Sequence, residues 1–222
     1  MMPDLARIYD QDFFAEWGRG HARYVESAGM ITDVLYGLFT PKSLVDVGTG
    51  CGVYAHFFAQ KGVAVTAIDG VAAPAEHAFP VPIELRDLTV PFDNVWGAFD
   101  VALCLEVAEH IPEAMCDVFL GNLTGLSDRL IMSAAQPNQG GHHHVNEQPK
   151  RYWVNKLAQK GFAYNRPETG RVQLALLESR PSYMWMAEQI SVYDKAKNPS
   201  QLRRLPFAVP PPSSKAPSSR PS

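Results

Sequence analysis

The chain has 222 residues, of which 46% are hydrophobic and 19% are charged, a composition that suits a globular protein with one substantial domain. Its formal net charge of −3 argues against a dedicated nucleic-acid-binding protein, which typically carries a basic stripe. No apolar run reaches the ~18 residues of a membrane helix, and the first residues lack the basic-then-apolar order of a signal peptide. Three widely spaced cysteines, Cys51, Cys104 and Cys116, are expected to be reduced, so we expect a cytoplasmic protein.

Helical periodicity dominates the N-terminal part of the chain. Aromatic and aliphatic side chains recur at three- and four-residue intervals through residues 9–39, with breaks expected near Gly18 and Gly29. Pro41 ends this segment before the first strand. We therefore expect residues 1–39 to form a helical cap laid across a sheet.

Buried strands alternate with helices through the middle of the chain, which predicts a parallel α/β sheet. Strands are expected at residues 44–47, 63–68, 83–85, 99–105, 129–135, 162–164 and 184–193. Helices are expected at residues 53–61, 71–79, 112–125, 149–160 and 168–179. We expect residues 40–197 to form the α/β domain and the Pro- and Ser-rich residues 198–222 to be a disordered tail.

The most informative stretch joins the first strand of this domain to its first helix. Gly48, Gly50 and Gly52 alternate directly after the strand, in the sequence LVDVGTGCGVY. Glycine permits positive φ and lets a ligand approach the backbone closely, so this arrangement is typical of a nucleotide-type site. A phosphate-binding P-loop is excluded because no Lys-Ser or Lys-Thr follows. Val53 stands where a dinucleotide fingerprint has its third glycine or alanine.

Three carboxylates near the strand ends narrow the ligand class. Asp46 lies within the first strand, where a carboxylate is costly unless a partner such as a ligand ammonium group satisfies it. Asp69 ends the second strand about 20 residues after the first glycine, the offset at which a carboxylate meets ribose hydroxyls. Asp87 follows the third strand, where it can accept from an adenine amino group or pair with Arg86. A ribose, an adenine and an ammonium-bearing tail together describe S-adenosylmethionine.

These motifs resemble, in the same order, those of class I S-adenosylmethionine-dependent methyltransferases, and most closely the small stand-alone methyltransferase-11/23 type. The matching runs are LVDVGTGCG at residues 44–52, TAIDG at residues 66–70 and FDVALCLEVAEHIP at residues 99–112. The resemblance covers roughly residues 40–193. It implies a doubly wound, seven-stranded, mostly parallel Rossmann-like sheet of strand order 3-2-1-4-5-7-6, with the last strand antiparallel.

The resemblance also implies roles for individual residues. The glycine turn would back the methionine moiety and Asp69 would bind the ribose. Asp87 and its neighbour Leu88 would lie by the adenine, while Leu105 and Glu106, after the fourth strand, would line the methionine side.

Two histidines are candidate general bases for a methyl acceptor. His110 lies just past the carboxyl end of the fourth strand, the edge where open α/β sheets bind ligands; packing or cofactor contact is its alternative role. His144 and Asn146 lie in the loop after the fifth strand, in a Gly-Gly…His-Val-Asn-Glu-Gln-Pro run that recurs in the resembled family. They would orient or deprotonate the acceptor, or belong to a purely structural loop. The run Glu147-Gln148-Pro149 is expected to cap the following helix rather than to touch substrate.

No metal site is expected from this loop. Three adjacent histidines invite a metal interpretation, but in an extended chain only His142 and His144 share a side. No cysteine or further histidine follows at ligand spacing.

We expect O- or N-methylation of a small-molecule or glycan-type acceptor, a class reached by elimination. The chain lacks the Asn/Asp-Pro-Pro-aromatic run used on amino groups of bases, and it lacks a Pro-Cys nucleophile, so nucleic acid is disfavoured. A module that binds S-adenosylmethionine without turnover is one alternative. An NAD-dependent oxidoreductase is another, since Tyr152 and Lys156 have the Tyr-x-x-x-Lys spacing of one hydride-transfer family, although the glycine turn matches neither dinucleotide pattern. Oligomeric state is not predicted.

Overall fold

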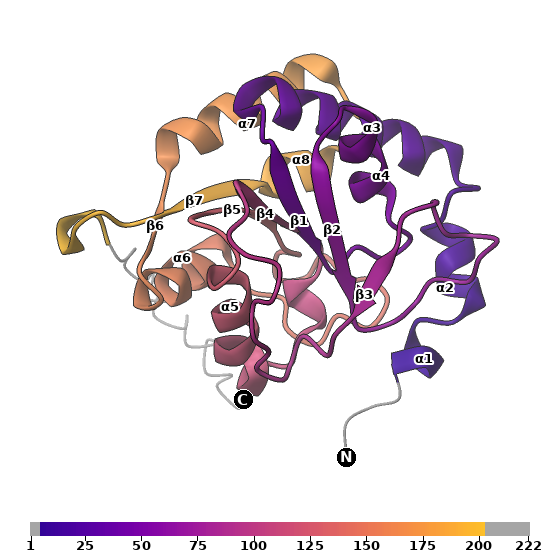
Figure 1. The fold of residues 1–222 in the computed structure, drawn as a ribbon, viewed down its shortest axis with the longest axis horizontal. Helices are drawn as coiled ribbons and strands as arrows, with labels where there is room; N and C mark the ends of the chain where they lie inside the picture. The colour runs from indigo at the N-terminus through magenta and orange to yellow at the C-terminus, as the bar shows by residue number, and fades with distance from the viewer. Residues whose placement is uncertain (1–4, 203–222) are drawn as a thin grey trace, which may run out of the picture.

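The computed structural model describes residues 5–202 and has one seven-stranded sheet with helices on both faces (Figure 1). The strands are β1 (Ser43–Val47), β2 (Ala64–Asp69), β3 (Ile83–Leu85), β4 (Val101–Leu105), β5 (Arg129–Ser133), β6 (Phe162–Tyr164) and β7 (Ser191–Lys195). Their spatial order is β3-β2-β1-β4-β5-β7-β6. Strand β7 runs antiparallel to both of its neighbours and the remaining pairs are parallel. The expected fold class and strand order are confirmed.

Eight α-helices and three 3-10 turns are present within residues 5–202. The helices are α1 (Leu5–Ile8), α2 (Gln11–Glu16), α3 (Ala22–Phe39), α4 (Val53–Gln60), α5 (Cys116–Thr124), α6 (Lys150–Gln159), α7 (Arg166–Ser179) and α8 (Met184–Gln189). The 3-10 turns are η1 (Ala108–His110), η2 (Glu113–Met115) and η3 (Pro199–Gln201). Within the described part of the chain, no helix combines the length and apolar character needed to cross a membrane.

Alternate strand residues point to opposite faces of the sheet and build two apolar layers. On one face Leu44 of β1 and Leu103 of β4 pack with α3, α4, α7 and α8. On the other face Val45 and Cys104 pack with α5 and α6. Every residue of β4 is buried, as expected for a central strand covered on both sides. Asp46 therefore lies on the same face as Leu44, toward α4.

The sequence-based element boundaries need four corrections. No break occurs at Gly29, because α3 runs through it without interruption. Residues 71–79 form turns rather than a helix; backbone bonds to the Pro74 carbonyl close only a single turn. The helix expected from Pro112 begins at Cys116, after η1 and η2.

The fourth correction concerns the expected strand at residues 184–193. Its first part is the helix α8, and only its end belongs to β7, which continues to Lys195. Met186, Ala187 and Ile190 are buried at helical spacing, so a short helical turn places all three against the sheet. Apolar runs of this length do not distinguish a strand from a buried helix by composition alone.

The C-terminal tail is described only at its start. Asn198 caps the short turn η3 together with Gln201, and the description ends at Leu202. The rest of the segment expected to be disordered lies outside the described residues.

Candidate active site

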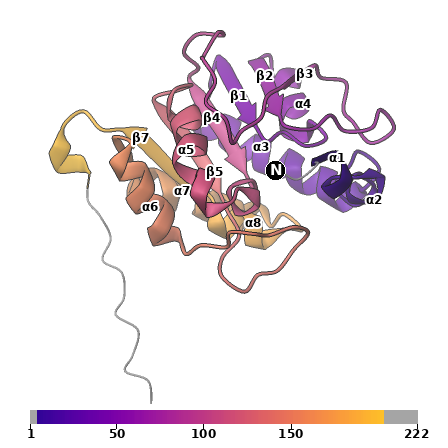
Figure 2. The same cartoon turned by 90° about the horizontal axis from the view of Figure 1, so that it is seen from below.

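Two adjoining cavities lie at the carboxyl ends of β1, β2 and β4. The smaller has a volume of about 200 Å³ and the larger about 560 Å³. They share six lining residues: Phe13, Phe14, Gly48, Gly50, Glu106 and His110. Helices α1 and α2, which Figures 1 and 2 place beyond the carboxyl ends of the strands, contribute the outer wall. Ligands of open α/β sheets bind at this edge, where the strand order reverses beside the first strand.

The glycine turn between β1 and α4 forms the floor where the two cavities meet. Gly48, Gly50 and Gly52 all have positive φ, at 74°, 57° and 83°. A side chain on Gly48 would collide with Val107, whereas a Cβ on Gly50 would meet no atom within 4 Å. The space above Gly50 is therefore open cavity. Gly52 lines neither cavity, and its conformation serves the start of α4.

Asp46 is a carboxylate buried inside β1 and lines the larger cavity. Only 2% of the residue is exposed, and the Thr49 hydroxyl donates a hydrogen bond of 2.6 Å to its Oδ2. Burial raises the pKa of Asp46 to about 7, against the opposing effect of hydrogen bonds from Thr49 and the Ala55 backbone. A positively charged ligand group beside Asp46 would stabilise its ionised form.

Asp69 lines the smaller cavity from the end of β2. Its carboxylate accepts hydrogen bonds from the backbone N–H groups of Gly50, at 2.7 Å, and Val71, at 3.0 Å. Burial nevertheless raises the pKa of Asp69. The carboxylate thus fixes the glycine turn and faces the cavity at the same time.

Asp87 and Leu88 complete the same wall. Asp87 is exposed, and its Oδ1 accepts from the backbone and hydroxyl of Thr89 at 2.8 and 2.6 Å. The salt bridge considered between Asp87 and Arg86 is not formed, because Arg86 pairs with Glu84. Leu88 is buried and offers an apolar surface beside this carboxylate.

Leu105 and Glu106 end β4 beside the glycine turn. Leu105 is buried and lines the larger cavity, while Glu106 lines both. Glu106 has φ of 55°, and its N–H donates to the Ser133 hydroxyl at 3.1 Å. Left-handed backbone at a residue other than glycine is strained, and such strain collects at functional sites.

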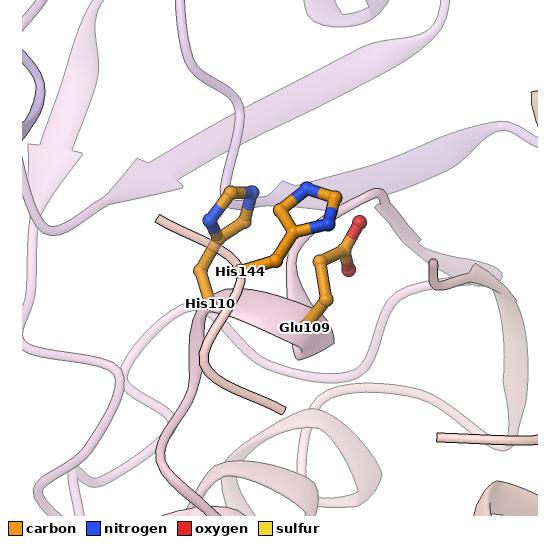
Figure 3. Close-up of side chains that lie close together, drawn as sticks. All are labelled: Glu109, His110 and His144. Carbon is orange, nitrogen blue, oxygen red and sulfur yellow. The ribbon is translucent and has the colours of Figure 1, made fainter. Parts of the chain in front are cut away.

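A cluster of Glu109, His110 and His144 lies in the wall of the larger cavity. Their ligand-type atoms are all within 4.8 Å of one another, and Figure 3 shows the two imidazole rings and the carboxylate gathered together. Glu109 is completely buried, and neither of its carboxylate oxygens has a hydrogen-bond partner among residues 5–202. The Glu109 carbonyl accepts from the N–H groups of Val145 and Asn146, which holds the histidine loop against η1.

The charge states of the cluster follow from its burial. Burial raises the pKa of Glu109 well above its ordinary value, and the neighbouring carboxylate of Glu106 raises it further. Burial lowers the pKa of His110 to about 4, so this imidazole is neutral at pH 7. Two imidazole nitrogens and one carboxylate form a donor set that suits divalent zinc, manganese or iron.

Glu147 orients His144 toward the cluster. Its Oε1 lies 2.9 Å from His144 Nδ1, and the carboxylate also accepts from the backbone N–H groups of Asn138 and Gly140 at 2.7 Å each. With Nδ1 bonded to a carboxylate, the other ring nitrogen of His144 is left for the cluster. Of the run 147–149 expected to cap the next helix, Pro149 is the N-cap of α6, without a side-chain hydrogen bond, while Glu147 instead bonds His144.

The structure separates the cluster from the residues that the sequence placed beside it. His142 lines the larger cavity but does not belong to the three-residue group, since its Nε2 bonds the carbonyl of Ile8. Asn146 is buried, donates to the carbonyl of Ile111 and lines neither cavity, so its role is structural. Glu109 is a member of the cluster that was not expected from the sequence. The available signal was that Glu109 follows β4 while His144 follows its neighbour β5.

The Tyr-Lys pair considered for hydride transfer lies elsewhere. Tyr152 and Lys156 belong to α6, and their polar atoms bond Glu113 and Asp117. Neither residue lines either cavity.

Comparisons with known proteins agree with this architecture. A family model described as a methyltransferase domain matches residues 17–164. Over 80 residues the chain is 36% identical to a ubiquinone biosynthesis O-methyltransferase of Pseudomonas paraeruginosa. The alignment covers 32% of this chain and 34% of that protein. Over 92 residues it is 39% identical to the protein of the same name from Paramagnetospirillum magneticum, covering 39% of this chain and 36% of that one. The chain thus spans about a third of the length of these curated relatives.

A solved structure supports the fold over most of the chain. It is a Burkholderia thailandensis 1,6-didemethyltoxoflavin-N1-methyltransferase with bound 1,6-didemethyltoxoflavin and S-adenosylhomocysteine. The TM-score is 0.56 at 18% sequence identity, and the alignment covers 88% of this chain and 91% of the other.

Proposed function

Because the chain belongs to the methyltransferase-domain family, we propose that it transfers a methyl group from S-adenosylmethionine to a small-molecule acceptor. One observation carries this proposal. Asp46, Asp69 and the glycine turn, which are separate in the sequence, line two cavities that adjoin at Gly48 and Gly50. Their chemistry matches the ammonium group, the ribose and the close backbone approach of this cofactor.

The side chains present fit S-adenosylmethionine. The open space above Gly50 leaves room for a ligand against the backbone, and buried Asp46 offers a carboxylate to a positive group. In this proposal Asp69 binds the ribose hydroxyls, and Asp87 and Leu88 flank the adenine in the smaller cavity. Asp46, Leu105 and Glu106 hold the methionine part, with Gly48 and Gly50 beneath it and Gly52 shaping the turn. When bound, the cofactor supplies a methyl group activated by its sulfonium.

The Glu109–His110–His144 cluster serves the acceptor side. Methyl transfer is an in-line displacement, so the protein must align the acceptor atom and favour its deprotonated form. Glu109 is buried and neither of its carboxylate oxygens has a hydrogen-bond partner among residues 5–202, which a cation completing the cluster would explain. We assign His110 and His144 to the same divalent cation, which would favour an ionised acceptor oxygen. If no cation binds, His144, held by Glu147, is the general base.

Two measurements test the proposal. Calorimetric titration with S-adenosylhomocysteine should show binding, and a homocysteine-release assay over a panel of acceptors should show turnover. Binding without turnover on any acceptor would instead support a cofactor-binding module. Binding of NAD more tightly than S-adenosylmethionine would support the oxidoreductase.

The reaction is proposed to take place in the cytoplasm. Cys51, Cys104 and Cys116 are all buried and free, as expected for a reducing compartment. The acceptor is either a saccharide or another small molecule, and the residues that line the larger cavity help to distinguish the two.

A further inference from the structure

The lining of the larger cavity indicates the chemical class of the methyl acceptor, an inference that rests on the proposed function. We infer that the acceptor is a planar aromatic compound that carries no carboxylate or phosphate group. Its hydroxyl or amino group faces the Glu109–His110–His144 cluster. This assignment is supported by an aromatic wall beside several carboxyl groups. Among the described residues, no lysine or arginine lines either cavity.

Aromatic rings from four different helices line the larger cavity. They are Phe13 and Phe14 of α2, Trp17 between α2 and α3, Tyr24 of α3, Tyr54 of α4 and Trp185 of α8. Ligand pockets with this lining bind flat apolar bodies, while a few polar groups fix their orientation. At about 560 Å³, the cavity has room for a substituted ring beside the methionine part of the cofactor, which Asp46, Leu105 and Glu106 hold there.

The rings hold one another in place. Trp17 packs edge-on against Tyr24 with centroids 5.4 Å apart, and Tyr183 packs against Trp17 at 5.7 Å and Trp185 at 4.5 Å. Tyr24 and Tyr183 also contact each other at 6.3 Å. A wall of mutually packed rings is preorganised, so it binds a rigid planar molecule with little further ordering.

Carboxyl groups line both cavities. Asp46, Glu106 and Glu109 line the larger cavity, and Asp69 and Asp87 line the smaller one. Of the residues that the structure describes, no lysine or arginine lines either cavity. An acceptor carboxylate or phosphate would leave water without a lysine or arginine to pair with, since the basic residues that line the cavities are histidines, of which His110 is neutral at pH 7. Neutral and cationic substituents avoid that penalty.

Much of the aromatic wall lies outside the segment that the family model matches. That match spans residues 17–164, while Phe13, Phe14 and Trp185 lie before or after it. The matched segment therefore contains the glycine turn and the cluster, while part of the aromatic wall comes from segments outside it.

Binding of matched phenols to the protein saturated with S-adenosylhomocysteine tests the inference. The probes are para-propylphenol, tyramine and para-hydroxyphenylpropionate, which share a phenol but end in a methyl, an ammonium and a carboxylate group. Isothermal titration should show para-propylphenol and tyramine binding at least about tenfold tighter than the carboxylate, since a carboxylate that gains no lysine or arginine partner loses its hydration without compensation. Methyl glucoside, a non-aromatic comparator, should show no measurable binding.

Two lysine substitutions separate local charge from general effects. Gln139 lines the larger cavity, so Gln139→Lys should tighten binding of para-hydroxyphenylpropionate about tenfold relative to para-propylphenol. Val95 is 72% exposed and lines neither cavity, so Val95→Lys adds the same charge and should leave the preference unchanged. Trp185→Leu should weaken binding of all three phenols.

Each outcome decides the inference. Equal or tighter binding of the carboxylate by the unmodified protein overturns the charge argument, and binding of methyl glucoside in preference to the phenols overturns the aromatic assignment. Failure of all three phenols to bind overturns it as well. Because binding is measured without turnover, these results are separate from the proposed methyl transfer. That proposal fails instead if S-adenosylhomocysteine itself does not bind.

Discussion

Replacing Asp46 with asparagine tests whether the protein retains a carboxylate that is costly to bury because it binds a ligand. Asp46 is 2% exposed, and burial raises its pKa to about 7 from an ordinary value of 3.8. Each pKa unit corresponds to about 1.36 kcal/mol, so ionisation of Asp46 destabilises the folded chain by about 4 kcal/mol relative to its protonated form. An asparagine of the same size is neutral at every pH.

The sign of the pH dependence follows from the direction of the shift. The folded chain holds this proton more tightly than the unfolded chain does, so stability falls as pH rises from about 4 to about 7. About 2.5 kcal/mol of this loss falls between pH 5 and pH 8. Asp46→Asn should therefore stabilise the ligand-free protein more at pH 8 than at pH 5, by about 2–3 kcal/mol.

Urea unfolding of the ligand-free protein at both pH values measures this difference. Asp93→Asn, at an exposed aspartate that lines neither cavity, is the matched control and should show no such pH dependence. Subtracting the two unfolding free energies removes the contributions of other titrating groups, because they are common to both proteins. If Asp46→Asn raises the free energy of unfolding by no more at pH 8 than at pH 5, the reasoning is refuted.

The same substitution should weaken the cofactor. A ligand ammonium group favours ionised Asp46, so affinity of the unmodified protein for S-adenosylhomocysteine should rise as pH increases through about 7. Asp46→Asn should bind more weakly at pH 8 and lose this pH dependence. Calorimetry that gives both proteins the same affinity and pH profile would place the ammonium elsewhere.

Three further predictions concern the glycine turn, the histidine loop and the cluster. Asp69→Ala removes a carboxylate that fixes Gly50 and is proposed to bind the ribose, so affinity for S-adenosylhomocysteine should fall by about 1–3 kcal/mol in calorimetry; unchanged affinity would remove Asp69 from the site. Glu147→Gln should lower turnover about 10- to 100-fold with cofactor affinity unaltered, because the charge that orients His144 is lost; full turnover would mean that the orientation does not matter. Treatment with EDTA should abolish turnover and added Mn²⁺ or Zn²⁺ should restore it, whereas Co²⁺ loaded into the chelated protein should give visible absorption bands that Glu109→Gln eliminates; activity that persists in EDTA would leave His144 as the base.

The local pattern of the sequence determines the strands and the turn that hold the cofactor side. Largely apolar runs specify β1 and β4, because strands covered on both faces need apolar residues at successive positions, whereas β2 is buried only at Ala67 and Ile68. The glycines at alternate positions specify a turn with positive φ, since other residues strongly disfavour it. Asp69 is also predictable from local sequence, because the last side chain of a parallel strand lies at the edge of the sheet where ligands bind.

Only the tertiary structure decides the acceptor side. Glu109 and His144 are far apart in the sequence. The expected strand order makes β4 and β5 neighbours, but only the structure shows that the side chains after these strands come together. Trp185 reaches the cavity only because residues 184–189 form a helix, where composition favoured a strand. Local propensity acts over a few residues, whereas this site depends on which distant segments share one edge of the sheet.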